Sequence, residues 1–148
     1  MEKIELNNKY RVLLHATMQK RDAGIIYVLS RILEHMGCQC IIVSNSTYCA
    51  PHIRMWNPHA VMFLTLSRAK LLGSTYPNAE LFYCAGEAGD SGEFSEELEL
   101  FDKPEYLDYI NKIFLWGEQI RDLIGQRFLR EANNKEVQKR KDDFINKI

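Results

Sequence analysis

Two carboxylates, Glu87 and Asp90, stand in a stretch whose residue types suit a catalytic or binding loop. The seven residues 86–92 include three glycines, which free the backbone for positive φ and for close approach to a ligand. The stretch follows an apolar, aromatic-rich run, residues 81–85, which is typical of a buried strand. Open α/β sheets bind ligands at the carboxyl ends of their strands, so Glu87 and Asp90 are the predicted catalytic residues. An acidic surface turn stays open as the alternative. The backbone predicted to contact ligand in this loop belongs to Gly86 and Gly89.

Polar or small residues also follow the other apolar runs of the chain. Hydroxyl, amide and carboxylate groups at these places suit hydrogen bonding to a polyhydroxylated ligand, and a helix N-terminus can receive an anion or a sugar hydroxyl. Each is equally an ordinary strand terminator or helix cap. The predicted substrate-binding residues outside the acidic loop are Thr17, Asp22, Gly24, Ser44, Asn45 and Thr65.

Five apolar runs alternate with helical patterns, and this predicts an α/β fold. The expected strands cover residues 10–17, 38–43, 60–66, 81–85 and 112–117. Continuous apolar strands are covered on both faces, as in a parallel sheet. The prediction is therefore a Rossmann-like three-layer sandwich with a five-stranded parallel sheet in the order 3-2-1-4-5. In that order strands one and four are neighbours, so the loops at residues 17–24 and 86–92 would share one crevice.

The first long helix is expected after Asp22, which is placed to cap it. Gly37 ends this helix in the C′ position. Its apolar face is predicted from residues at three- and four-residue spacing. These residues are Ile25, Ile26, Leu29, Ile32, Leu33 and Met36.

Composition narrows the class of protein. The 148 residues carry a formal net charge of −1, which gives no indication of nucleic-acid binding. The first ten residues lack an apolar segment typical of a signal peptide, and no apolar run approaches the roughly 20 residues that span a bilayer. The four cysteines are read as reduced thiols, which predicts a cytoplasmic protein. Residues 1–126 are expected to form the α/β domain, and residues 127–148 a charged helical tail. A solvated tail is favoured over a partner-binding one or one that attaches to the inner membrane face.

Several familiar sites have no support in the sequence. Neither a dinucleotide-binding glycine pattern nor a phosphate-binding P-loop follows the first strand, and no serine stands in a nucleophile elbow. Cys49 and His52, with His59 seven residues on, form only a fragment of a zinc site, because a tetrahedral set needs more ligands. We therefore predict neither a metal nor a cofactor.

The segment 108–120, which contains Trp116, Gly117 and Glu118, resembles part of the bacterial surface-carbohydrate and capsule biosynthesis proteins. Those proteins are similar to glycosyltransferases of the two-Rossmann GT-B type. In them a strand ending in Trp-Gly-Glu precedes the helix that closes the N-terminal domain. The run Gly86-Glu87-Ala88-Gly89-Asp90 looks like the acidic loop that they carry after strand four. The resemblance spans about residues 10–124, and its motifs are short.

The resemblance implies an acceptor-side domain of a polysaccharide-synthesising glycosyltransferase. Its partners would be a sugar acceptor and, through a second domain absent from these 148 residues, a sugar nucleotide. Alone, the chain would then be inactive, and a homodimer or a partner subunit stays open. Glu87, or second Asp90, would be the general base that takes the proton of the acceptor hydroxyl. The alternatives are a receiver-like or cobalamin-binding-like module without catalysis, and a purely structural subunit. The former lacks the paired acids or the histidine motif of those families.

Overall fold

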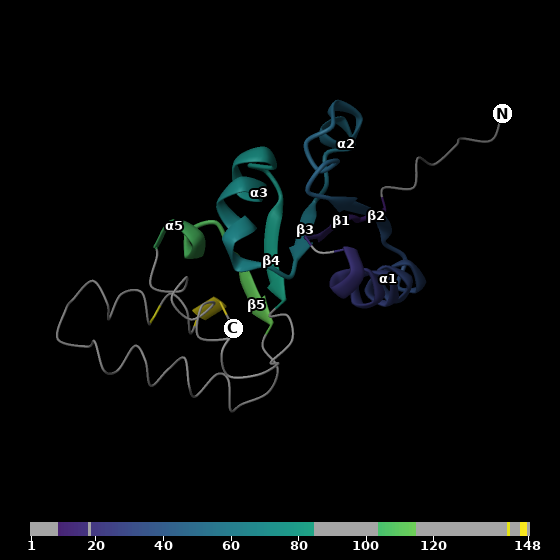
Figure 1. Cartoon of the computed structure of the whole chain (residues 1–148), viewed down its shortest axis with the longest axis horizontal. Coiled ribbons are helices and arrows are strands. Elements are labelled where there is room, and N and C mark those ends of the chain that lie inside the picture. The colour runs from purple at the N-terminus through teal and green to yellow at the C-terminus, as the bar shows by residue number, and fades with distance from the viewer. Residues whose placement is uncertain (1–8, 18, 85–103, 115–141, 143–145, 148) are drawn as a thin grey trace.

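Five parallel strands and the helices between them form the framework of the chain (Figure 1). The computed structural model describes residues 9–17, 19–84, 104–114, 142 and 146–147. The strands are β1 (Arg11–Ala16), β2 (Gln39–Ser44), β3 (Ala60–Phe63), β4 (Glu80–Cys84) and β5 (Lys112–Phe114). The helices are α1 (Gln19–His35), α2 (Pro51–Trp56), the 3-10 turn η1 (Leu66–Arg68), α3 (Ala69–Thr75) and α5 (Pro104–Leu107). This arrangement confirms the predicted Rossmann-like α/β fold.

The strand order is β2-β1-β3-β4-β5, and every neighbouring pair is parallel. The predicted order 3-2-1-4-5 is wrong in the position of the third strand, which lies between β1 and β4. All four residues of β3 are buried, whereas β2 has only one buried residue of six. In a parallel sheet with helices on both faces, the strands in the middle are buried more completely than the edge strands. The unbroken apolar run at residues 60–64, against the mixed run at 38–43, was a signal for this central position.

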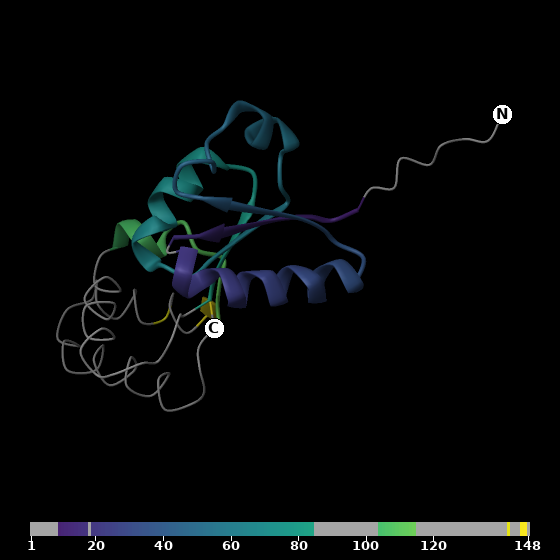
Figure 2. The same ribbon diagram turned by 45° about the vertical axis from the view of Figure 1, so that its right-hand side comes forward.

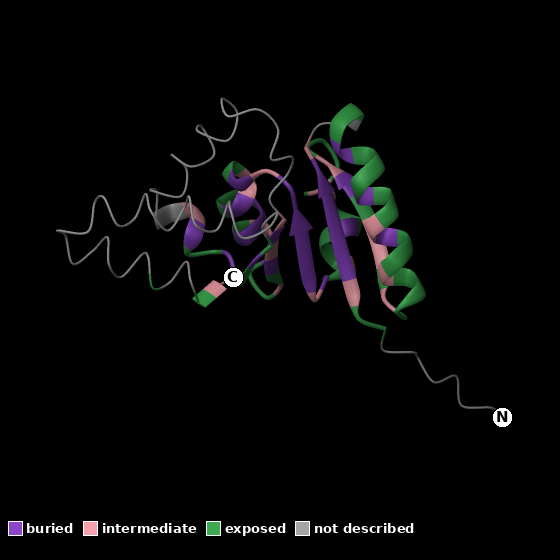
Figure 3. Cartoon of the chain, turned by 90° about the horizontal axis from the view of Figure 1, so that it is seen from below, coloured by how far each residue is buried: buried purple, intermediate pink, exposed green. Residues whose placement is uncertain are grey.

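Helices cover the two faces of the sheet, and each face has its own core (Figure 2). On one face α1 packs on β1 and β2, with Ile26 fully buried against Leu14 and Met62. On the other face α2 and α3 enclose a larger core that includes Leu13, Phe63 and Tyr83. Figure 3 shows the middle of the sheet as buried and the outer side of α1 as exposed. Successive residues of β1 therefore serve opposite cores, as strand geometry requires.

The ends of α1 differ in how well the sequence predicts them. Gly37 stands just after the helix with φ +95, and the next amide, Cys38 N–H, bonds back to the Leu33 carbonyl at 2.9 Å, as expected of a C′ glycine. The helix begins at Gln19, so Asp22 lies within its first turn rather than at its cap. The predicted apolar face is only partly right, because Ile25, Ile32 and Met36 are exposed.

All four cysteines are free thiols, and both Cys38 and Cys40 pack against the core beneath α1. None of the described helices is both long and apolar enough to cross a bilayer. Of the predicted tail, the structure describes Asp142, Asn146 and Lys147 alone, and the Nζ of Lys147 donates to the Leu107 carbonyl at 2.6 Å. The rest of the tail lies outside the described residues.

Candidate functional site

The strand order reverses between β1 and β3, and this point locates the candidate site. From β1 the chain passes through α1 to β2 on one side, and then returns past β1 to β3. Because α1, which follows β1, and α3, which follows β3, lie on opposite faces of the sheet (Figure 2), the loops after β1 and β3 diverge. Open α/β sheets bind ligands at such a switch point, outside the carboxyl ends of the strands.

A pocket of about 730 Å³ opens beside this point, at the carboxyl ends of β1 and β2. We call it the β1–β2 pocket. Its polar lining is Thr17, Ser44, Asn45, Ser46 and Thr47, and its apolar lining is Ala16, Ala23, Tyr27, Ile42 and Val43. Tyr27 is 60% exposed. The described lining residues are all uncharged, so the pocket combines hydroxyl and amide groups with one aromatic ring.

Hydrogen bonds hold the polar side of the pocket in place. The Ser44 hydroxyl lies 2.9 Å from that of Ser46 and 3.2 Å from that of Thr47, and Thr47 Oγ1 accepts the Ser44 N–H at 2.9 Å. Asn45 Nδ2 donates to the Thr17 carbonyl at 3.4 Å, which joins the loop after β2 to the end of β1. A hydroxyl offers one donor and two acceptor positions. These groups therefore keep capacity for a ligand.

Next to the pocket, four polar side chains lie at the end of β1 and in the segment that follows β3. We call His15, Thr17, Thr65 and Arg68 the switch-point cluster. Within the described chain, both ring nitrogens of His15, the hydroxyls of the two threonines and Nε of Arg68 are buried without a hydrogen-bond partner. His15 stands opposite Phe63 in the β1–β3 register, and the Arg68 N–H bonds to the Thr65 carbonyl at 3.0 Å. Buried polar groups are nearly always paired. Orphans gathered at a switch point indicate a place that a ligand or water completes.

The charge state of His15 follows from its surroundings. Its ring is 0% exposed and makes an edge contact with Tyr48, at a centroid distance of 5.9 Å. Burial, followed by the positive charge of Arg68, lowers the pKa of His15 to about 4, against the smaller opposing effect of the Asp22 charge. At neutral pH the ring is therefore uncharged, with one nitrogen free to accept a hydrogen bond and the other to donate one.

The structure brings together most of the substrate-binding residues predicted before the acidic loop. Thr17, Ser44 and Asn45 line the β1–β2 pocket, and Thr65 belongs to the adjoining cluster. Asp22 is 1% exposed, and its carboxylate accepts the Thr17 N–H at 3.0 Å and pairs with Arg21 at 2.9 Å. Asp22 thus positions the end of β1. Gly24 does not line the pocket, and a Cβ atom added there would meet nothing within 4 Å.

The predicted catalytic loop, unlike the substrate-binding residues predicted outside it, is not described by the structure. Gly86, Glu87, Gly89 and Asp90 lie outside the described residues. The predicted crevice between this loop and residues 17–24 assumed that the first and fourth strands are neighbours. That assumption is wrong, because β3 separates β1 from β4. The loop that follows β1's actual neighbour begins at Leu64 and contains Thr65 and Arg68.

Two residues of the candidate site, Tyr27 and Arg68, were not identified from the sequence. Tyr27 belongs to α1 but lies off its buried face, and an aromatic residue between two apolar stripes was the available signal. Arg68 follows β3 by five residues within η1, and only the central position of β3 gives it importance.

One histidine of the possible zinc fragment has other partners in the structure. His59 Nδ1 accepts the Arg11 N–H at 2.9 Å, and its ring stacks on Tyr10. Among the described residues, no three His, Cys, Asp or Glu side chains gather where they could hold a metal ion.

Comparison of the chain with protein-family models, with curated proteins and with solved structures finds no match.

Proposed function

We propose that the chain binds an uncharged saccharide in the β1–β2 pocket, as the acceptor-side half of a glycosyltransferase. The observation that carries this proposal is the pocket's lining. It combines neutral hydroxyl and amide groups with the exposed ring of Tyr27. A sugar has the complementary surface, because its hydroxyls form hydrogen bonds while its C–H faces pack on aromatic rings.

The lining also favours an acceptor over a donor. A sugar nucleotide carries a diphosphate, for which proteins supply cations or helix N-terminal amides. The described residues that line the β1–β2 pocket supply no charged side chain. A neutral acceptor sugar needs none, in agreement with the resemblance to the N-terminal domain of GT-B enzymes.

Pre-organisation supports binding as well. The hydroxyls of Ser44, Ser46 and Thr47 are already joined to one another, and Asn45 is tied to the Thr17 carbonyl. Groups that are ordered before binding lose less entropy when a ligand arrives. Glu87 and Asp90 stay the predicted general base and its neighbour, because transfer to an acceptor hydroxyl needs a proton acceptor.

Titration calorimetry with a panel of neutral mono- and oligosaccharides tests the proposal, with a sugar nucleotide as the charged comparison. We expect saturable binding of a neutral saccharide. Tyr27→Ala and Asn45→Ala should each weaken it about tenfold, the loss expected for one ring contact or one hydrogen bond.

Met36→Ala serves as the matched control, because Met36 is an exposed side chain beyond the far end of α1. It should bind as the original chain does. Absence of saccharide binding across the panel, or equal affinity in all three variants, would contradict the proposal. Binding without transfer by any assembly that contains the chain would instead favour a non-catalytic binding module.

A further inference from the structure

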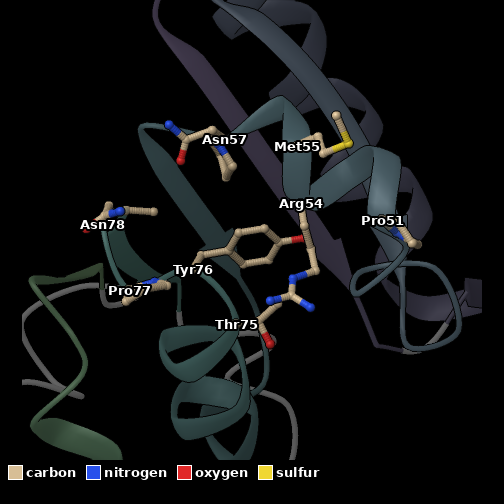
Figure 4. Close-up of a pocket in the computed structure, with 10 residues that line it drawn as sticks. Pro51, Arg54, Met55, Asn57, Thr75, Tyr76, Pro77 and Asn78 are labelled. Carbon is tan, nitrogen blue, oxygen red and sulfur yellow. The ribbon is translucent and has the colours of Figure 1, made fainter.

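A second pocket lies at the opposite, amino-terminal edge of the sheet. It encloses about 450 Å³ between the end of α2, the turn into β3 and the turn from α3 into β4. We call it the Arg54 groove. Figure 4 shows Tyr76 at its floor, Arg54 on one side, and Asn57, Pro77 and Asn78 around the remainder. It shares no lining residue with the β1–β2 pocket.

The floor of the groove is rigid. Tyr76 is 5% exposed, and its hydroxyl donates to the Tyr48 carbonyl. Burial raises the pKa of Tyr76 to about 12, so the hydroxyl stays a donor at neutral pH. The ring therefore cannot turn away without losing this bond.

The rim formed by Asn57 is equally fixed. Asn57 has left-handed backbone angles, with φ 50, and its N–H bonds to the Arg54 carbonyl at 3.1 Å. Its own carbonyl accepts two hydrogen bonds from the Arg11 guanidinium, at 3.1 and 3.0 Å. Asparagine tolerates this conformation better than most residues. Asn57, whose backbone is held by Arg11, is one of the residues that line the groove (Figure 4).

The charged side chains at the groove are positive. Arg54 is the charged member of the described lining, and the nearby Arg11 is engaged with the Asn57 backbone. The side chains of Arg54, Asn57 and Asn78 form no hydrogen bond or ion pair with another described residue. A guanidinium that pairs with no described acidic residue is suited to a bidentate carboxylate or phosphate. The rest of the wall is apolar, with three prolines and Met55.

We propose that the Arg54 groove binds a small organic anion with a flat, largely apolar body. The anionic group, a carboxylate or a phosphate monoester, pairs with the Arg54 guanidinium. The body lies against Tyr76 and the prolines, and the amides of Asn57 and Asn78 bond to its polar edge. This site does not depend on the proposed saccharide site, because it lies at the other edge of the sheet.

Nitrogen-15 NMR titrations of the full 148-residue chain test the inference with three probes: benzoate, phenyl phosphate and uncharged benzyl alcohol. We expect saturable shifts at Arg54 Nε, at the side-chain amides of Asn57 and Asn78, and at Tyr76. A dissociation constant of about 1 mM is reasonable for probes of this size. The tighter of the two anions identifies the preferred group, and benzyl alcohol should bind at least about tenfold more weakly than that anion.

Two variants separate specific binding from general charge. Arg54→Gln should weaken both anions about tenfold and leave benzyl alcohol unaffected. Asn57→Gly keeps the left-handed backbone while removing the amide, and should weaken the anions about threefold. Arg31→Gln, a change to an exposed arginine of α1, is the control and should bind as the original chain does. Lack of saturable shifts at the groove, unchanged anion binding in Arg54→Gln, or an equal loss in Arg31→Gln would overturn the inference.

Discussion

At the scale of single residues, His15 is the least ordinary feature of the fold. An imidazole with both nitrogens buried and unpartnered loses hydrogen bonds that water would supply. It stays in place because its ring fills the end of the β1–β3 region and packs on Tyr48. Placed in the switch-point cluster, it is a neutral group ready to accept or donate one hydrogen bond.

The lowered pKa of His15 should be detectable in the pH dependence of stability. Its folded pKa of about 4 lies below the ordinary 6.5, so acid protonates the unfolded chain first and favours unfolding. The free energy of unfolding should therefore fall by about 3 kcal/mol between pH 7 and pH 4 on account of this residue. Chemical denaturation at several pH values should show that His15→Phe removes this part of the pH dependence. His35→Gln, which changes an exposed histidine, should keep it. An identical pH profile in His15→Phe and the original chain would contradict the assignment.

The sequence was sufficient to predict which residues follow the strands at the carboxyl edge of the sheet. Thr17, Ser44, Asn45 and Thr65 follow apolar runs, and parallel strands deliver their carboxyl ends to one edge. Tyr27 and Arg68 were not, because each lies on a helical segment. Whether such a residue reaches the edge depends on the rotation of that segment and on the strand beside it, which periodicity alone does not determine.

At the scale of elements, two helical glycines have opposite roles. Gly24 in α1 has open space around its α-carbon, whereas a methyl group on Gly73 of α3 would overlap the ring of Tyr109. The atoms that it would meet include the first ring carbon and Cβ of Tyr109, which move less freely than the end of a side chain. Close packing of α3 against the segment after α5 therefore requires glycine at this position.

Matched alanine substitutions test this difference. Gly24→Ala should raise the free energy of unfolding by about 0.5–1 kcal/mol, since alanine favours the helix. Gly73→Ala should lower it by about 1–3 kcal/mol, because the overlap outweighs the helix propensity. Urea denaturation measures both changes. A gain in stability for Gly73→Ala would show that Tyr109 moves aside at little cost.

The existence of the elements was predictable, and their ends less so. Five apolar runs became five strands, and Gly37 ended α1 as expected. The start of α1 was missed because Asp22 resembles a cap. In the structure its carboxylate serves the Thr17 amide and Arg21 instead. The same residue type, aspartate, can cap a helix or anchor a buried loop, and only tertiary contacts distinguish the two roles.

At the scale of the whole molecule, the strand order was the main error, and burial explains it. Right-handed crossovers permit the chain to leave β2 toward either side of the sheet. The observed path carries α2 to the face opposite α1, where Ile53 joins the core of Leu13 and Val43. β3 thereby becomes central and β2 becomes an edge strand.

This arrangement makes β1 a structural centre with two cores. Leu13 and Leu14 are both fully buried, one on each face. Leu13→Ala and Leu14→Ala should each lower the free energy of unfolding by about 2–5 kcal/mol. Ile42→Ala on the edge strand, where the side chain is 46% exposed, should lower it by less than about 1.5 kcal/mol. Denaturation curves compare the three. A small loss for either leucine would mean that one face of β1 is poorly covered.

The hydrogen bond from the Tyr76 hydroxyl to the Tyr48 carbonyl joins the two ends of the sheet. The ring of Tyr48 touches His15 at the carboxyl edge, while Tyr76 forms the floor of the Arg54 groove at the amino edge. One pair of tyrosines thus borders both regions. Thermodynamic reciprocity then applies: whatever factor an occupant of the groove applies to affinity at the switch point, an occupant of the switch point applies equally to the groove.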